Sequence, residues 1–336
     1  MSLSEKLLVR EVPFDESRLR KVAAVCQQFD SHPPFSDYTL LGKPSVLCLM
    51  SDKTLHNSTG SDFFCPNPLD IEWQITLGIA LVNGNEAEMV IIPGHRKNGY
   101  GTYFLNEIRK RIPGDVKFWA HGAHPAALAL AKRYEATEER VVCIMHLKNP
   151  RARVKSLLQS LSRMRWIEYA KRVLQKVAFL SRRGAVESVT YRCFRTGRGT
   201  KATRDEIEWL ALNAEIFKDH PEYGKLTIND LRLCYSQPWF SRKRFILAIK
   251  NGKVAGYVWI KLNKHSRKGE IYSLGSTGGG LGSKLLERAL DIMYRRGVEL
   301  IFLYVDETNK KAINLYRKFN FAEVERDILF NVRGGR

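Results

Sequence analysis

The feature that most constrains the fold of this 336-residue chain is a long internal repeat. Residues 70–147 and 254–332 follow the same order: a strand pair, a glycine-containing turn that enters a helix, a β-rich run, a short helix and a closing strand. The last segments align without gaps, which pairs Ala127 with Ala312, Leu130 with Leu315, and Tyr134 with Phe319. A period this long indicates a duplicated domain and not a solenoid unit. The alternation of strands and helices predicts an α/β (α+β) fold of two units with mixed sheets.

The length also suits two domains that each bury a core. We expect an N-terminal domain over residues 1–147, a basic linker helix over 148–185 and a C-terminal domain over 186–336. Residues 148–183 carry eleven Lys and Arg against one acid, Glu168, and apolar residues recur there at helical spacing. Such a helix could bind RNA or an anionic membrane surface. We favour the packing of its apolar stripe on the two domains, with its charges in water.

Composition indicates a globular, cytoplasmic protein. Hydrophobic residues make up 44% of the chain, and no apolar run approaches the roughly 18–20 residues that span a bilayer. The N-terminus lacks the apolar core of a signal peptide. Six scattered cysteines have no metal-ligand spacing, so we expect reduced thiols and no metal. The formal charge of +20 fits either a polyanionic partner or solubility. We favour solubility, and expect a monomer with neither a membrane nor a nucleic acid partner.

A phosphate-binding pattern follows the first strand pair. The strand Met89–Ile92 leads into Arg96-Lys97-Asn98-Gly99-Tyr100-Gly101, which has the form R-x-x-G-x-G and opens a helix. The glycines let backbone N–H groups approach an anion closely, and the helix N-terminus adds partial positive charge. A tight turn without a ligand would use the same glycines.

The second half carries an altered copy of this loop. In "SLGSTGGGLGS", residues 273–283, Thr277 stands where the pattern has Arg or Gln. Seven positions separate Met89 from Arg96, but only three separate Leu274 from Thr277, so the second loop is four residues shorter. Either the helix start has moved upstream to compensate, or the loop has lost charge-assisted bonds to an anion, each worth roughly 1.5–3 kcal/mol.

The order of strand, R/Q-x-x-G-x-G/A loop, helix, strand and final "LYxxxxF" helix resembles the GNAT acyl-CoA acyltransferases. Five segments narrow the resemblance to the mycothiol synthases, a family of tandem GNAT proteins: "FWAHGAHPAALALA", "AEIFKDHPEYGKLT", "QPWF", "GEIYSLG" and "LYVDETNKKAINLYRKFNF". It covers most of residues 20–332 and is weakest across 148–190. It implies two GNAT domains with splayed sheets, in which the loop holds the pyrophosphate of coenzyme A and the acyl-thioester lies where two strands separate.

The resemblance also implies a reaction, the last step of mycothiol biosynthesis. An acetyl group passes from acetyl-CoA to the cysteinyl amine of cysteinyl-glucosaminyl-inositol, and no metal takes part. The amine must lose a proton, the oxyanion must be stabilised, and the leaving thiolate must gain a proton.

Carried over by position, the resemblance implies Glu270 as general base and Tyr316 as the group that protonates the leaving sulfur. Backbone N–H groups near Leu274 to Ser276 would face the oxyanion. The substrate contacts it implies are Asp37, Glu222, Lys261, Glu270 and Tyr304. The cofactor contacts are Met89, Val90, Ile91, Arg96, Lys97, Asn98, Gly99, Tyr100, Gly101 and Thr102 in the first half, and Leu274, Gly275, Ser276, Thr277, Gly278, Gly279, Gly280, Leu281, Gly282, Ser283, Asn309, Lys310, Lys311, Ala312, Ile313 and Asn314 in the second.

Simpler interpretations of these residues stay open. Glu270 could be a solvent-facing strand residue, Tyr316 a core tyrosine, and Glu222 part of a turn. Because Ala131 aligns with Tyr316, we expect the first half to bind a CoA-like ligand without efficient turnover, and the second half to be catalytic. Two alternatives remain: a GNAT activity on another small amine or a protein N-terminus, or a basic nucleic-acid-binding protein on a GNAT scaffold that has lost catalysis.

Overall fold

The structure is a computed structural model that describes residues 7–51, 76–149, 189–197, 201–218, 223–263 and 267–334. The chain divides into two compact units. Unit 1 comprises Met1–Cys143 together with Glu325–Arg336, and unit 2 comprises Ile144–Val324. Glu222 and nearly all of the expected linker helix lie outside the described residues.

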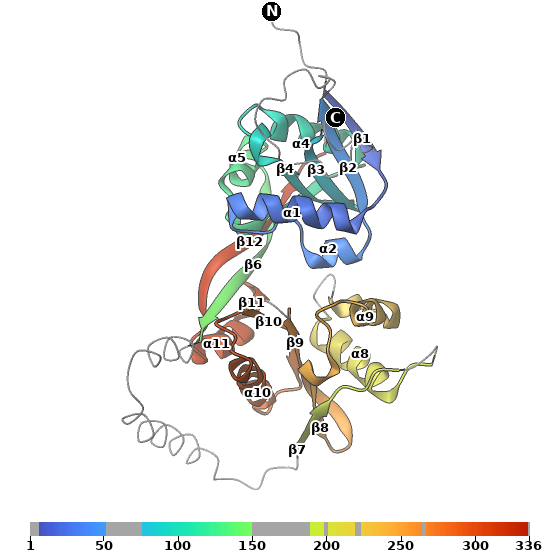
Figure 1. Ribbon diagram of the computed structural model, residues 1–336, viewed down its shortest axis with the longest axis vertical. Helices are drawn as coiled ribbons and strands as arrows, with labels where there is room; N and C mark the ends of the chain where they lie inside the picture. The colour runs from blue at the N-terminus through green and yellow to red at the C-terminus, as the bar shows by residue number, and fades with distance from the viewer. Residues whose placement is uncertain are drawn as a thin grey trace, which may run out of the picture. The chain divides into compact units, whose positions relative to one another are not determined.

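Unit 1 is built on mixed strands with helices on both faces (Figure 1). Its elements are β1 (Leu7–Val12), α1 (Glu16–Asp30), α2 (Asp37–Leu41), β2 (Ser45–Ser51), β3 (Thr76–Asn83), β4 (Glu86–Ile91), α4 (Tyr100–Arg111), β5 (Val116–Ala120), α5 (Pro125–Arg133), the first part of β6 (Thr137–Lys148) and most of β12 (Ala322–Val332). The strands lie in the order β1-β2-β3-β4-β5-β12-β6. The pairs β1–β2, β2–β3, β3–β4 and β5–β12 are antiparallel, whereas β4 and β5 are parallel.

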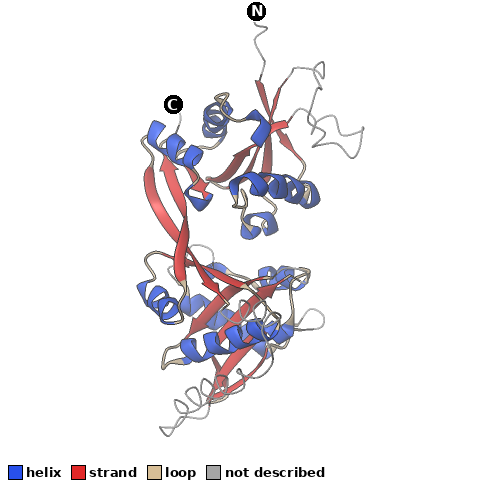
Figure 2. Cartoon of the chain, turned by 60° about the vertical axis from the view of Figure 1, so that its left-hand side comes forward, coloured by secondary structure: helices blue, strands red, loops and turns tan. Residues whose placement is uncertain are grey.

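Unit 2 repeats this plan, with α8 and α9 on one side of its strands and α10 and α11 on the other (Figure 1). Its elements are the end of β6, β7 (Val189–Cys193), α8 (Arg204–Ile216), α9 (Ile228–Tyr235), β8 (Phe245–Lys250), β9 (Lys253–Leu262), β10 (Lys268–Ser276), α10 (Leu281–Arg295), β11 (Leu300–Asp306) and α11 (Lys310–Lys318). The strands lie in the order β6-β11-β10-β9-β8-β7. Figure 2 shows the alternation of strands and helices along both units.

The elements of the two units correspond as the repeat predicts. The hairpin β3–β4 corresponds to β9–β10, and the crossover through α4 to β5 corresponds to that through α10 to β11. The helices α5 and α11 have nine residues each, so the gap-free alignment of their sequences is confirmed. Each begins with a side chain that accepts a hydrogen bond from the first turn, His124 in α5 and Asn309 in α11.

Local sequence accounts for the helices of unit 2. In α8, Thr203 and Glu206 form a reciprocal capping box, in which each side chain bonds the other residue's backbone N–H. In α10 the residues Leu281, Leu285, Leu286, Ala289, Leu290 and Met293 are buried, and their spacing of three and four places them on one face. That face packs on the sheet, where the Leu285 side chain lies against Gly256 of β9.

The closing strand of the second repeat lies in unit 1. Residues Ile328–Val332 of β12 pair antiparallel with β5. Ile328 and Phe330 are buried in a cluster with Leu105 of α4 and Phe118 of β5. The Phe118 and Phe330 ring centroids are 5.5 Å apart. The core of unit 1 is therefore completed by residues more than two hundred positions further along the chain.

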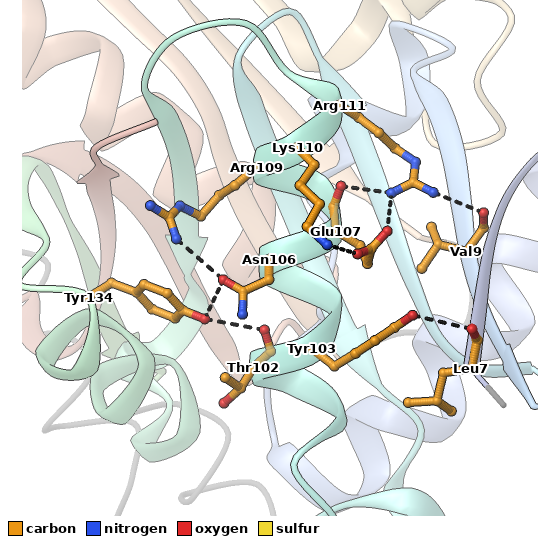
Figure 3. Close-up of polar contacts among 10 residues, drawn as sticks. All are labelled: Leu7, Val9, Thr102, Tyr103, Asn106, Glu107, Arg109, Lys110, Arg111 and Tyr134. Carbon is orange, nitrogen blue, oxygen red and sulfur yellow. Dashed lines mark hydrogen bonds and ion pairs between the residues drawn. The ribbon is translucent and has the colours of Figure 1, made fainter. Parts of the chain in front are cut away.

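Side-chain bonds to its neighbours anchor α4 along its length (Figure 3). The Tyr103 hydroxyl donates to the Leu7 carbonyl at 3.2 Å, and Arg111 donates to the Val9 carbonyl at 3.1 Å, so the helix is tied to β1. On its other side, the Tyr134 hydroxyl donates to Asn106 Oδ1 at 2.8 Å. These contacts fix the helix whose N-terminus carries the first glycine loop.

Replacement of Phe330 by Ala should destabilise unit 1 by about 3–5 kcal/mol, because it leaves a cavity between β5 and α4. Hydrogen exchange measured by peptide should show lost protection in residues 100–120, far away in sequence. Val324→Ala, at an exposed position two residues into the same strand, is the control. Loss of protection confined to unit 2 would contradict this assignment of the strand.

Candidate active site

The candidate site of unit 2 begins where two parallel strands separate. The strands β10 and β11 pair only at Lys268 with Leu300, Gly269 with Ile301, and Glu270 with Phe302. Beyond Glu270 β10 continues for six residues, to Ser276, beside β9 alone. The register between β10 and β9 shifts between Ile271 and Ser273, which marks a bulge at Tyr272. The pair of strands therefore opens at Glu270.

Backbone N–H groups line the β10 side of this opening. The Thr277 N–H donates to the Ala255 carbonyl of β9 at 3.0 Å. Because alternate residues of an antiparallel ladder point their amides to opposite sides, the N–H groups of Leu274 and Ser276 point away from β9 and toward the gap. The edge of β10 thus offers two backbone donors inside the opening.

Glu270 lies at the closed end of the gap and is buried, with 8% of its surface exposed. It stands directly opposite Lys261 of β9, and Glu270 Oε2 is 3.1 Å from Lys261 Nζ. The Lys261 ammonium also lies 5.6 Å from the centre of the Trp239 ring and 5.7 Å from that of Tyr272. The simpler alternative of a solvent-facing glutamate does not hold, since Glu270 is a buried carboxylate paired with a cation.

A second buried polar group lies on β9, next to α8. The Tyr257 hydroxyl donates to Asn213 Oδ1 at 2.6 Å and lies 3.1 Å from Ser273 Oγ. Burial raises the pKa of Tyr257, and the nearby Tyr316 adds to this rise. Tyr316 of α11 is itself buried, with its ring 5.8 Å from that of Phe321. Burial raises the pKa of Tyr316, so its hydroxyl stays protonated at neutral pH.

The second glycine loop keeps its helix start and has lost residues only upstream. In unit 1 eight residues, 92–99, separate β4 from α4, whereas in unit 2 four residues, 277–280, separate β10 from α10. Each helix begins directly after a left-handed glycine, Gly99 with φ 81° or Gly280 with φ 76°, and neither has a side-chain cap. The helix start has therefore not moved upstream, and the shortened loop turns through Gly278, Gly279 and Gly280, all with positive φ.

In unit 1 the side chain of Arg96 contacts the edge of the corresponding opening. The strands β4 and β5 pair only at Glu86 and Ala87 before they separate. Arg96, the first residue of the R-x-x-G-x-G loop, donates from Nε to the Ile91 carbonyl at 2.9 Å and from Nη2 to Asp30 Oδ2 at 2.7 Å. Arg96 thus ties the loop to α1 and to the end of β4.

Next to this opening lies a buried ionic cluster of Glu88, His121 and Asp327. Glu88 accepts hydrogen bonds from the Ser36 N–H at 2.8 Å and the Thr39 hydroxyl at 2.9 Å. His121 Nε2 lies 3.4 Å from Glu88 and Nδ1 lies 3.1 Å from Asp327. Burial alone would lower the pKa of His121, but Asp327 and Glu88 raise it to about 10. His121 is therefore an imidazolium held between two carboxylates.

The repeat relates one member of this cluster to the unit-2 site. Alignment of "AEMV" with "GEIY" pairs Glu88 with Glu270. Each glutamate stands opposite one residue of the preceding strand, Leu81 in unit 1 and Lys261 in unit 2. The sequence reasoning missed Glu88, although the alignment of "AEMV" with "GEIY" would have found it.

The structure brings some of the expected site residues together and separates others. Lys261 and Glu270 form an ion pair, and Tyr304 follows Phe302 on the same face of β11. Asp37 lies in unit 1, where Arg20 donates to it at 3.1 Å. Asn309 caps α11 through the Ala312 N–H, and Ile313 is buried in the core. Lys310, Lys311 and Asn314 are exposed.

Comparisons with known proteins agree with this geometry. A family model described as "Acetyltransferase (GNAT) family" matches residues 207–321. The mycothiol acetyltransferase of Salinispora arenicola (strain CNS-205) is 36% identical over 248 residues, which cover 71% of this chain and 70% of that protein. The one from Kocuria rhizophila is 28% identical and covers 95% of this chain and 96% of its own length.

The chain belongs to the mycothiol acetyltransferase family. It is accordingly an acyltransferase of the GNAT type, as the sequence predicts, and the proteins of that type take acetyl-CoA as co-substrate. The duplicated fold recurs in solved structures. A tandem GNAT protein from the clavulanic acid biosynthesis pathway matches with a TM-score of 0.61 at 13% identity, covering 98% of this chain and 99% of that one. A GCN5-related N-acetyltransferase from Sphaerobacter thermophilus gives 0.59 at 17% identity, covering 98% and 96%.

Among the helices described, none is long and apolar enough to cross a membrane. Within the same part of the chain, no group of His, Cys, Asp and Glu is arranged to hold a metal ion.

The raised pKa of His121 predicts a loss of stability in alkali. The folded-state value of about 10 lies above the ordinary 6.5, so the stabilisation is fully present below pH 6.5 and is lost as the pH rises through 10. Asp327→Asn should make the free energy of unfolding fall less between pH 7 and pH 10, by on the order of 1 kcal/mol. Urea denaturation at both pH values measures this. Asp291→Asn, which removes an exposed ion pair with Arg295, is the control. If the free energy of unfolding depended equally on pH in the unchanged protein, in Asp327→Asn and in Asp291→Asn, the role of His121 would be contradicted.

Proposed function

We propose that unit 2 transfers the acetyl group of acetyl-CoA to the cysteinyl amine of cysteinyl-glucosaminyl-inositol. The observation that carries this proposal is the opening between β10 and β11, with buried Glu270 at its closed end and two backbone donors along its edge. Membership of the mycothiol acetyltransferase family supports the substrate. In this proposal the C-terminal domain, residues 186–336, is catalytic, and the N-terminal domain, residues 1–147, binds a CoA-like ligand without turnover.

Glu270 is the proposed general base. Attack on the thioester carbonyl requires a neutral amine, and an amine near neutral pH carries a proton that must leave. Because Glu270 pairs with Lys261, its carboxylate form is favoured and can accept that proton, directly or through a water molecule. The cysteinyl amine would then attack from the face of the strands that carries α8 and α9.

The oxyanion and the leaving group have separate partners in this proposal. The N–H groups of Leu274 and Ser276 point into the gap and would stabilise the negative charge that develops on the carbonyl oxygen. Tyr316 would donate its proton to the sulfur of the departing coenzyme A. Its pKa, raised by burial, keeps the hydroxyl protonated until a thiolate forms beside it.

The remaining contacts follow from these positions. Residues 274–283 and 309–314 would hold coenzyme A, with the pyrophosphate at the N-terminus of α10. Lys261 and Tyr304 would face the sugar-inositol part of the acceptor, and Asp37 and Glu222 are retained as proposed contacts.

Unit 1 would bind a CoA-like ligand without turnover. Ala131 stands in the place of Tyr316, and Glu88 accepts hydrogen bonds from Ser36 and Thr39 and lies beside the His121 cation. Donors and a cation that stabilise the charged form of a carboxylate make it a weaker base for a substrate amine. The uncapped N-terminus of α4 supports the ligand proposal, with residues 89–91 and 96–102 as the contacts.

Removal of either proposed catalytic group should slow turnover. Glu270→Gln is expected to lower kcat/KM by on the order of 10²-fold or more, since the amine loses its base, and Tyr316→Phe by a similar order. Steady-state release of coenzyme A with cysteinyl-glucosaminyl-inositol measures both. Tyr294→Phe, on the far part of α10, is the control. Activity of Glu270→Gln equal to that of the unchanged protein would reject the base, and preference for another amine would reject the acceptor.

Two aspartate variants distinguish the loops. Gly280→Asp places a carboxylate at the N-terminus of α10 and should weaken acetyl-CoA binding at least tenfold, whereas Gly99→Asp should leave turnover intact and remove only a second binding event. Isothermal titration measures both. The matched controls are Gly252→Asp and Gly84→Asp, which carry the same backbone strain at hairpin turns without neighbours. If Gly99→Asp abolished all binding, coenzyme A would not belong in unit 2.

A further inference from the structure

The position of Lys261 relative to Glu270 is set by strand pairing. Lys261 lies on β9 directly across the ladder from Glu270 of β10, so the backbone register and not a flexible loop sets the distance between them. Lys261 Nζ and Glu270 Oε2 are 3.1 Å apart, and the two side chains are 14% and 10% exposed.

Two aromatic rings hold the same cation. The centroids of Trp239 and Tyr272 lie 5.6 Å and 5.7 Å from Lys261 Nζ, within the distance at which a ring attracts an ammonium group. The rings also exclude water from the pair: Trp239 packs on Trp259 and on Tyr272, with centroids 5.7 Å and 4.9 Å apart. The ammonium group is therefore fixed from several sides and partly desolvated.

Such a cation changes what its carboxylate can do. A buried carboxylate without a partner favours its neutral form, while a cation within about 4–6 Å favours the charged form by one to three pH units. A protonated glutamate cannot accept a proton from an amine. The ion pair also limits the rotamers of Glu270, since loss of contact with Lys261 would leave both charges buried and unpaired.

Unit 1 gives an internal comparison. Its counterpart of Lys261 is Leu81, which is fully buried, and the charge of Glu88 is met by His121 and by hydroxyl and amide donors instead. The glutamate occurs in both units, but a lysine faces it only in the unit that carries Tyr316.

We propose that Lys261 is a positioning residue for the transfer reaction, which keeps Glu270 ionised and directed toward the gap. This rests on the proposed role of Glu270 as base. It gives Lys261 a function beyond contact with the acceptor, because the cation acts on the protonation of its partner. The proposal predicts that the acidic limb of the pH–rate profile follows the charge at position 261.

Other titratable groups lie on the elements that flank this ion pair, and their effect on the pH profile must be distinguished from that of Lys261. Cys234 of α9 lies beside Tyr272, and burial raises the pKa of its thiol to about 11, so it does not titrate in acid. On the opposite side, Tyr304 follows on β11, and His146 of β6 packs on Phe302 with ring centroids 6.3 Å apart. Of these three groups, only the histidine belongs to a residue type whose ordinary pKa falls in the pH range of the acidic limb of a pH–rate profile.

The test compares Lys261→Met, Lys261→Arg and His146→Gln by the pH dependence of kcat and kcat/KM, with acetyl-CoA and the pseudodisaccharide acceptor. Lys261→Met should lower kcat about tenfold or more and move the acidic limb upward by at least one pH unit, while Lys261→Arg restores the position of the limb. His146→Gln should leave the limb where it is. Lys253→Met, at an exposed position of the same strand, should change neither constant. Where Lys261→Met is not recovered folded by circular dichroism, Lys261→Gln supplies the comparison.

The outcomes separate this proposal from the one on which it rests. A raised KM for the acceptor with an unchanged acidic limb in Lys261→Met would overturn the positioning role and leave a substrate contact. The positioning role would also be overturned if the acidic limb of the pH–rate profile moved in His146→Gln and not in Lys261→Met. Full activity of Glu270→Gln would reject the base itself, whereas an inactive Glu270→Gln with an unmoved limb in Lys261→Met would reject only the inference about Lys261.

Discussion

The separation of β10 from β11 after Glu270 is the constraint on which the rest of unit 2 depends. Parallel strands that stayed paired to their ends would satisfy each other's amides and leave no space between them. Once they part, the N–H groups of Leu274 and Ser276 lack a strand partner on that side, and the bulge at Tyr272 turns this segment. An unpaired strand edge accepts a ligand that carries amide groups in the way it accepts another strand. Coenzyme A has such groups in its pantetheine arm, so the opening suits the donor proposed for it.

The corresponding strands of unit 1, β4 and β5, also separate, but different side chains lie beside their opening. Arg96 donates to the Ile91 carbonyl at the edge of β4, and Glu88 accepts hydrogen bonds from Ser36 and Thr39 and pairs with His121. The difference between the units lies in a few side chains on one backbone plan: leucine or lysine opposite the glutamate, and alanine or tyrosine on the last helix. A duplicated fold can therefore carry different side chains at the corresponding opening of each copy, while the strands and helices that frame the opening stay in place.

Much of this arrangement is visible in the sequence, and the remainder depends on long-range pairing. The repeat, the helix starts after Gly99 and Gly280, and the matching lengths of α5 and α11 all follow from local patterns. The burial of Glu270 does not, because a glutamate between apolar residues fits an exposed strand position equally well. The cluster of Glu88, His121 and Asp327 draws on three distant segments, and no local pattern indicates that β12 lies beside β5. The contacts expected for Glu222 stay a prediction.

The position of β12 also makes the core of unit 1 depend on residues from the second half of the chain. Each half of the repeat ends in a strand. The closing strand β12 belongs to unit 1 from Glu325 onward, whereas β6 belongs to unit 2 from Ile144 onward. The core around Phe118 therefore closes only when Phe330 is present, and Asp327 supplies one of the two carboxylates that hold His121. Contacts of such sequence separation form late, since the entropy of closing the chain must be met before they add stability. Unit 1 is thus completed only with the last residues of the chain. Each half of the repeat therefore contributes residues to both compact units.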